Sequence, residues 1–167
     1  MARKKRKKNR KKVCKKSFEY LNDPESKIYK DSLKRNRKII NKKLKITKIR
    51  TLTSNIKVIG TFKEIINHIK RPAVELVRSF FSYNRFTNCQ HCHRSKLSND
   101  VKQLERAHCN RPNCDRVSLL KHSTEKYYKD KNTPVLLKHI YKHFIKLHGK
   151  IPMYYLCTKC HRTYDKN

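Results

Sequence analysis

The sequence lacks long apolar runs. No stretch of its 167 residues approaches the roughly 18 consecutive apolar residues that span a bilayer. The N-terminal region also lacks the apolar segment that follows the charged start of a secretory signal peptide. No internal repeat of solenoid length is present. These absences argue against a membrane protein and predict a chain that stays in a reducing, intracellular compartment.

Acidic residues are scarce. The chain has 12 Asp and Glu against 45 Lys and Arg, and its formal net charge is +33. A field of one sign this strong is normally tolerated where a polyanion neutralises it, and nucleic acid is the commonest polyanion. An anionic membrane surface or a purely solubilising role is the alternative, but no amphipathic anchor accompanies the basic residues. The composition therefore predicts a nucleic-acid partner and no membrane partner.

We predict the least regular structure for the N-terminal third of the chain. Residues 1–16 are almost all Lys and Arg without apolar periodicity, so we expect a disordered tail that acts as a phosphate-binding arm or a nuclear localisation signal. The candidate nucleic-acid contacts in this tail are Arg3, Lys4, Lys5, Arg6, Lys7 and Lys8. Residues 17–60 form a basic, poorly defined extension, in which weak alternation at Leu44 and Ile46 suggests a strand.

Residues 61–85 are predicted to form a helical hairpin. Thr61 and Glu64 have the spacing of a capping box, which predicts the start of a helix at this point. Pro72 is expected to end that helix and to occupy the first position of a second one. Apolar residues on both sides of Pro72 recur at helical spacing. We therefore expect the hairpin to pack on the cysteine-rich remainder, residues 86–167.

The C-terminal half contains further helix signals. Residues 115–129 are compatible with a helix that turns three residues inward, namely Val117, Leu120 and Thr124. A better marked helix has Thr133 as N-cap, Pro134 at its first position and Gly149 just past its end. Residues 151–156 are short, aromatic and apolar, which predicts a strand.

Two Cys-x-x-Cys pairs carry the strongest chemical signal. Seven cysteines in a reducing compartment favour metal ligands over disulfides. Cys89 with Cys92, and Cys157 with Cys160, can each present two thiolates to one tetrahedral ion. Four thiolates close the coordination sphere, so we predict a structural zinc that clamps the two ends of the domain together.

Other cysteine assignments stay open. His93 and His161 each follow a Cys-x-x-Cys pair, which is also the attachment pattern of c-type haem, but haem attachment needs an exported, oxidising setting. Cys109 and Cys114 are too widely spaced for the simplest knuckle and are interpreted as reduced thiols. The alternative is a second zinc, for which they would need a further ligand from His91, His93 or His122.

The segment between the cysteine pairs suggests a family. Leu104-Glu105-Arg106-Ala107-His108 follows the first pair, and Leu156 and His161 flank the second. In this order, Cys-x-x-Cys, Glu-x-Ala-His and Leu-Cys-x-x-Cys-His resemble the zinc-containing HNH endonucleases, whose core is a ββα-metal finger. The resemblance extends over about half the chain, from Cys89 to Asp165. The Arg-Pro-x-Cys and Lys-Leu-His-Gly surroundings faintly resemble HNH proteins encoded by large DNA viruses.

The resemblance implies roles for particular residues. His108 matches the general base that activates the attacking water, a role that suits imidazole because it titrates near neutrality. His161 matches a ligand of a catalytic divalent ion, Mg²⁺ or Mn²⁺. Ala107 stands where the family often supplies a further ligand, and Glu105 is the nearest substitute. Both catalytic candidates, His108 and Glu105, lie on the same short segment.

The predicted fold class is α+β. We expect a zinc-clamped ββα-metal, HNH-like core with a helical insertion, additional N-terminal helices and a disordered basic tail. Arg106 and Arg111, close to His108, are further candidate nucleic-acid contacts. The expected function is metal-dependent hydrolysis of phosphodiester bonds in DNA, preferred over RNA, in the nucleus or another DNA-containing compartment, including one of viral origin. The alternatives are a non-enzymatic zinc-ribbon protein that binds DNA or RNA and, more distantly, a ribosomal or RNA-chaperone role.

Overall fold

The structure, a computed structural model of the whole chain, describes residues 17–46, 49–81, 86–95, 97, 101 and 103–166. Within these ranges the chain is mixed α+β, as predicted. Its helices are α2 (Glu19–Asn22), α3 (Lys27–Ile46), α4 (Arg50–Thr53), α5 (Phe62–Phe80), α6 (Arg116–Glu125), α7 (Leu137–Leu147) and α8 (Thr158–Tyr164). Its strands are β1 (Lys57–Val58), β2 (Leu104–His108), β3 (Val135–Leu136) and β4 (Met153–Cys157). The basic tail and its six candidate contacts lie outside the described residues.

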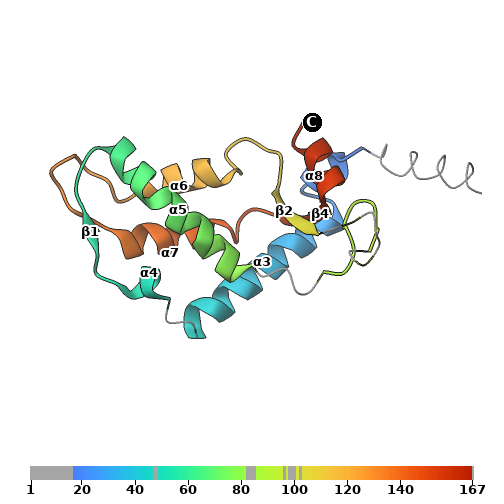
Figure 1. Cartoon of the computed structure of the whole chain (residues 1–167), viewed down its shortest axis with the longest axis horizontal. Coiled ribbons are helices and arrows are strands. Elements are labelled where there is room, and N and C mark those ends of the chain that lie inside the picture. Colours follow the sequence, from blue (N-terminus) through green and yellow to red (C-terminus); the bar gives the residue numbers. More distant parts are fainter. Residues whose placement is uncertain are drawn as a thin grey trace, which may run out of the picture.

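The elements are arranged along an elongated molecule (Figure 1). Helices α5, α6 and α7 pack against one another at one end, whereas β2, β4 and α8 pack together at the other. Helix α3 contacts α5, α7 and β4, so it runs between the two ends. One continuous set of buried apolar residues extends through both ends. The helical part therefore forms a scaffold on which the small sheet and α8 are held.

Strands β2 and β4 form an antiparallel pair that leads directly into α8. Leu104 pairs with Cys157 at one end of the ladder and His108 pairs with Met153 at the other. All five residues of β4 are buried, as expected for a strand covered on both faces. The strand predicted for residues 151–156 is thus confirmed, shifted by one to two residues. This pairing brings β2 beside the start of α8.

The predicted hairpin in residues 61–85 is wrong, because the structure has one continuous helix, α5. Its start is as predicted: the Thr61 side chain accepts from the backbone N–H of Glu64, and Glu64 accepts in return from the backbone N–H of Thr61. Pro72 lies inside α5 and removes one backbone hydrogen bond. The helix continues because one buried apolar stripe crosses Pro72, formed by Ile65, Ile66, Ile69, Ala73, Leu76, Val77 and Phe80.

The strand suggested at Leu44 and Ile46 is also wrong, because both residues belong to the helix α3. The buried stripe of α3 contains Tyr29, Ser32, Asn36 and Ile40, which recur at helical spacing. Two of these four residues are polar, so apolar periodicity alone does not reveal the helix. Part of the poorly defined extension is therefore an integral element of the core.

Helices α6 and α7 differ from the prediction at their ends. Asp115 caps α6 by accepting from the backbone N–H groups of Val117 and Ser118, but Val117 is 40% exposed and does not point inward. Helix α7 begins at Leu137, beyond the predicted Thr133 and Pro134. The reason is that Val135 and Leu136 pair with β1, so these two residues are extended when α7 begins.

Gly149 lies just past α7, as predicted, but for a different reason. Among the described glycines only Gly60 has a positive φ, so Gly149 is not a left-handed helix cap. A Cβ at position 149 would lie 3.2 Å from the carbonyl oxygen of Lys146 and 3.3 Å from Ile40 Cδ1. Gly149 therefore permits the close approach of α3 to the end of α7.

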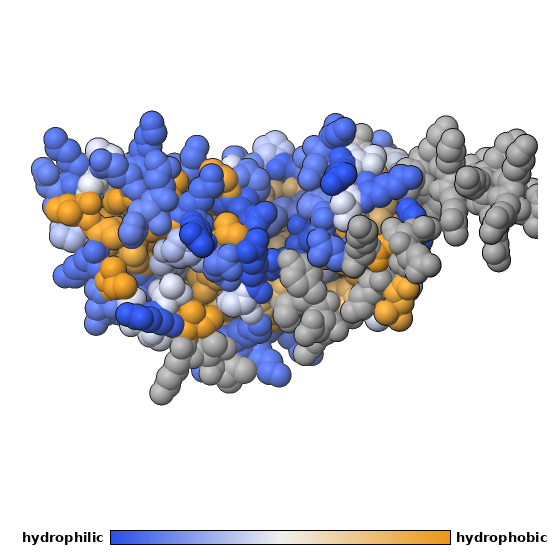
Figure 2. All heavy atoms as spheres, viewed as in Figure 1, coloured by the Kyte–Doolittle hydropathy of each residue, from blue (hydrophilic) through white to orange (hydrophobic). Residues whose placement is uncertain are grey.

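The surface is largely hydrophilic. Figure 2 shows polar and charged side chains over most of the visible face, with apolar side chains in small separate groups. The large apolar residues that are exposed within the described ranges are Ile56, Ile59, Leu97 and Val117. No helix in these ranges combines the length and the apolar character needed to cross a bilayer.

Candidate functional site

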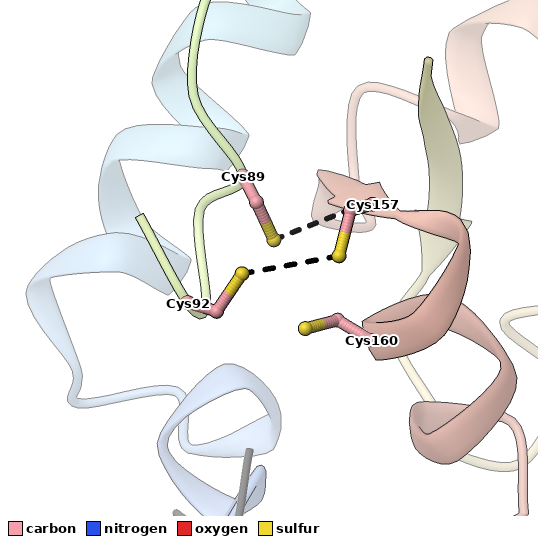
Figure 3. A group of neighbouring side chains, drawn as sticks. All are labelled: Cys89, Cys92, Cys157 and Cys160. Atoms are coloured by element: carbon pink, nitrogen blue, oxygen red, sulfur yellow. Dashed lines mark hydrogen bonds between the residues drawn. The ribbon is translucent and has the colours of Figure 1, made fainter. Parts of the chain in front are cut away.

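Four cysteines from two distant segments form a compact cluster. Cys89 and Cys92 lie in a tight loop, Cys157 ends β4, and Cys160 lies in α8. All four are buried, and their Sγ atoms lie within 4.8 Å of one another. Figure 3 shows the four thiols pointing toward a common centre between the loop and α8. The predicted grouping of the two Cys-x-x-Cys pairs is confirmed.

The cluster fits a tetrahedral metal ion such as zinc. Zn–S bonds of about 2.3 Å place two sulfur ligands about 3.8 Å apart, and the Sγ atoms of Cys92 and Cys157 are 3.8 Å apart. The backbone N–H of Cys157 donates to Cys89 Sγ at 3.3 Å. The hydrogen bond from the Cys160 thiol, with others from the backbone, outweighs burial and lowers the pKa of Cys89 to about 4. Cys89 is thus held toward the thiolate form that a metal binds. Among the thiols themselves, burial raises the pKa of Cys157, and the hydrogen bond to Cys89 raises that of Cys160.

Gln90 joins the loop of the first cysteine pair to β4 through two hydrogen bonds. The backbone N–H of Gln90 donates to the carbonyl oxygen of Tyr155 at 2.9 Å, and its side-chain Oε1 accepts from the backbone N–H of Tyr155 at 2.7 Å. The loop itself is closed by the backbone N–H of Cys89, which donates to the carbonyl oxygen of Arg94 at 2.9 Å. Sequence reasoning missed Gln90, because no motif marks a side chain that completes a strand edge.

Beyond the cysteine cluster, Glu105 on β2 pairs with His161 on α8. His161 Nδ1 lies 2.6 Å from Glu105 Oε2, and Thr158 Oγ1 donates to Glu105 Oε1 at 3.0 Å. The other ring nitrogen of His161 lies 3.4 Å from Asp165 Oδ2. Partial burial raises the pKa of Glu105, but the hydrogen bonds from His161 and Thr158 outweigh it and hold that pKa below its usual value. Glu105 is therefore a carboxylate at neutral pH.

The predicted catalytic residues line one cavity. A cavity of about 460 Å³ is lined by Glu105, Arg106, His108 and His161, together with Arg78 and Arg116. An adjoining hollow of about 540 Å³ shares Arg106, His108 and His161 and adds Arg111 and Asp165. The structure thus brings all five sequence-predicted residues of this region together, namely Glu105, Arg106, His108, Arg111 and His161. Arg78, Arg116 and Asp165 were not predicted.

His108 is the last residue of β2 and lies partly buried. Its ring borders both hollows, but its Nε2 atom is buried and has no hydrogen-bond partner among the described residues. Burial, His148 and the cations Arg116 and Arg106 lower the pKa of His108 well below its usual value. His108 is therefore neutral at pH 7, the form in which an imidazole accepts a proton.

Arg106 and Arg111 are held by neutral oxygen acceptors. Arg106 Nη1 donates to the carbonyl oxygens of Val77 and Phe81, each at 3.0 Å, at the C-terminal end of α5. Arg111 Nη1 donates to the hydroxyl of Tyr29 at 3.3 Å. Both hollows are lined by several arginines: Arg106 and Arg116 line both, Arg78 lines one and Arg111 the other. These cationic side chains suit an incoming anion.

The cavity offers fewer metal donors than the cysteine cluster. Among the described residues, only the four cysteines gather three or more donor atoms closely enough to hold one ion. The alternative of a second zinc on Cys109 and Cys114 is therefore not supported. Glu105 and His161 supply two adjacent donors, and Mg²⁺ is commonly bound by one or two protein ligands that water and substrate phosphates complete.

Comparison of the chain with protein-family models, with curated proteins and with solved structures returned no match.

Proposed function

We propose that the chain is a metal-dependent endonuclease of the HNH type that hydrolyses phosphodiester bonds in DNA. The observation that carries the proposal is the meeting of His108, from the end of β2, and His161, from α8, at one cavity beside the cysteine cluster. A four-cysteine site that only binds a structural metal needs no histidine at position 108 or at position 161. Their order along a strand, a second strand and a helix is that of a ββα-metal core.

The residues of the cavity suit hydrolysis. Neutral His108 would remove a proton from a water molecule, whose oxygen attacks phosphorus while the bond to the leaving oxygen breaks. Glu105 and His161 would hold Mg²⁺ or Mn²⁺, which supplies positive charge beside the scissile phosphate. Arg106, Arg111 and Arg116 would hold the flanking phosphates by charge. The zinc held by the cysteines would maintain the shape of the site.

One observation favours a second candidate, a non-enzymatic zinc-built protein that binds DNA or RNA. Ala107 stands where a further metal ligand is expected, and among the described residues no third donor lies close to both Glu105 and His161, since Asp165 contacts only His161. Such a protein would use the same cysteine clamp and the same excess of positive charge without cutting. The nuclear or viral location stays a prediction, because the basic tail lies outside the described residues.

The first experiment is a cutting assay on plasmid DNA with Mg²⁺ or Mn²⁺. We expect ion-dependent nicking by the wild type and a loss of roughly 100-fold or more for His108→Ala, because a general base is removed. The matched control is His139→Ala, which removes an exposed histidine of α7 that lies outside both hollows. It should cut like the wild type.

Two measurements accompany the assay. The zinc content of each variant shows that the clamp is intact, and a filter-binding assay without added ions shows that the DNA is still bound. If the wild type binds DNA tightly but does not cut it with Mg²⁺ or with Mn²⁺, the enzyme proposal fails and the non-enzymatic protein remains. RNA of matched sequence in the same assays tests the preference for DNA.

A further inference from the structure

His148 is a buried histidine beside the proposed base, His108. It follows α7 directly and has no exposed surface. Its ring lies against aromatic side chains, with the centroid 4.6 Å from that of Phe144 and 6.2 Å from that of Phe81. Its third ring neighbour is His108, at 5.4 Å between centroids and an interplanar angle of 67°. A buried histidine therefore stands directly behind the proposed base.

One hydrogen bond determines the tautomer of His148. Its Nδ1 lies 2.8 Å from the carbonyl oxygen of Phe144. A carbonyl oxygen can only accept, so Nδ1 carries the proton. Burial, with the nearby cations Arg116 and Arg106, lowers the pKa of His148 to about 4 and keeps the ring neutral at pH 7, despite the opposing bond to Phe144. In a neutral ring with a proton on Nδ1, Nε2 carries a lone pair and can only accept.

The two adjacent histidines each have an unsatisfied nitrogen. The Nε2 atoms of His148 and His108 are both buried, and neither has a hydrogen-bond partner among the described residues. A buried polar atom that is left unpaired destabilises the folded state, and native proteins keep few of them. If His108 carries its proton on Nε2, one ring offers a donor and the other an acceptor, and one water between them satisfies both atoms.

We propose that His148 is a positioning residue for His108: one buried water bridges the two rings, accepting from His108 Nε2–H and donating to His148 Nε2. His108 Nδ1 is then unprotonated and is the atom that accepts a proton. The catalytic meaning of this pair rests on the proposed nuclease function, whereas the pair itself does not.

The surroundings of the pair favour neutral rings. The charged groups that act on the two histidines are Arg106 on β2, Arg116 on α6 and Asp115 at its N-cap, and the two cations disfavour a charged imidazole. The backbone of His148 is also anchored, because Asn36 Nδ2 on α3 donates to its carbonyl oxygen at 3.4 Å. The backbone of His148 is therefore anchored to α3, while its ring faces His108 on β2.

The direct test is the tautomeric state of both rings. Long-range ¹H–¹⁵N correlation spectra of the uniformly ¹⁵N-labelled, zinc-loaded chain at pH 7 separate protonated from unprotonated ring nitrogens. We expect a proton on Nδ1 of His148 and on Nε2 of His108. A proton on Nε2 of His148, or on Nδ1 of His108, would overturn the proposal whether or not the protein cuts DNA.

A pair of variants tests the positioning role. His148→Phe keeps an aromatic ring but has no acceptor, whereas His148→Gln can place an amide oxygen near the position of Nε2. We expect His108 to lose its single tautomer in His148→Phe and to keep it in His148→Gln. In the cutting assay, kcat should fall roughly 10- to 100-fold in the Phe variant, with KM unchanged, and recover at least in part in the Gln variant.

The outcomes separate the two proposals. If the wild type never cuts but the expected tautomers are found, the nuclease function fails and the histidine pair stands. If the wild type cuts and His108 keeps the same tautomer in a folded, zinc-loaded His148→Phe variant, the positioning role fails and the nuclease function stands. The wild-type spectrum remains decisive where the Phe variant does not fold.

Discussion

At the residue scale, burial changes the chemistry of histidine more than sequence context does. His148 and His139 belong to the same basic segment, but His148 is wholly buried whereas His139 is exposed. Burial disfavours the charged ring and leaves neutral imidazole, which can donate through one nitrogen and accept through the other. The proposed pair of His148 and His108 depends on this difference.

Acid should destabilise the protein through His148. Its pKa is about 4 in the folded chain, below the ordinary value of 6.5, so the unfolded chain binds more protons between these values. The stability contributed by neutral His148 is present above pH 6.5 and is lost as the pH falls through 4. We expect the free energy of unfolding to fall by roughly 3 kcal/mol over this range, as measured by urea unfolding at successive pH values.

The control for this prediction is His148→Phe, which retains the cysteines and the other histidines. Its unfolding free energy should depend less on pH between 6.5 and 4, because the group that titrates is gone. Zinc content measured at each pH separates loss of the metal from protonation of the ring. Parallel pH profiles for the two proteins would contradict the assignment to His148.

At the element scale, α3 stabilises the segment that joins α7 to β4. Ser32 Oγ donates to the carbonyl oxygen of Met153 at 2.8 Å and accepts from its backbone N–H at 2.9 Å. Arg37 Nε donates to the carbonyl oxygen of Gly149 at 3.1 Å. These side chains satisfy backbone groups just after α7, at Gly149, and at the first residue of β4, Met153. The position of His148 therefore depends on a helix more than 100 residues earlier.

Asn36 is the residue of α3 whose loss should be costly. It is buried, and its Nδ2 donates to the carbonyl oxygens of His148 and Ile151, at 3.4 and 3.0 Å. We expect Asn36→Ala to lower the free energy of unfolding by about 1–3 kcal/mol, because two buried carbonyls lose a donor. The matched variant is Asn41→Ala, on an exposed position of the same helix, and chemical denaturation compares the two. Equal stability of these variants would show that the buried bonds contribute nothing.

At the scale of the whole molecule, the cysteine cluster joins segments that are far apart in the chain. Cys92 and Cys157 are separated by 65 positions, and the helices α6 and α7 lie between them. A metal bound at this cluster holds the end of β4 and the start of α8 against the Cys89 loop, next to the cavity lined by Glu105 and His161. Folding and metal binding should therefore be coupled.

Removal of the metal tests this coupling. We expect the purified chain to contain one zinc ion, and Cys160→Ser to lose most of it and to unfold at a lower temperature, because a closed site needs all four ligands. Cys114→Ser changes a partly buried thiol outside the cluster and should keep the full zinc content. Atomic emission and thermal unfolding make the comparison, and an unchanged zinc content in Cys160→Ser would refute the four-cysteine site.

The sequence by itself determined those features that depend on neighbouring residues or on residue type. The ligand set of the cysteine cluster follows from two Cys-x-x-Cys pairs, the start of α5 follows from Thr61 and Glu64, and the mixed α+β class follows from periodicity. Each of these rules acts over a few residues, so a one-dimensional pattern contains the whole signal.

Only the tertiary structure decided the rest, because burial depends on residues that are distant in the chain. Helix α5 continues through Pro72 since its apolar stripe is covered by α6 and α7, which outweighs one missing backbone bond. Helix α3 was missed because Ser32 and Asn36 fill buried positions by bonding to the chain near Met153 and Ile151. The same folding sets His148 behind His108, which no local pattern predicts.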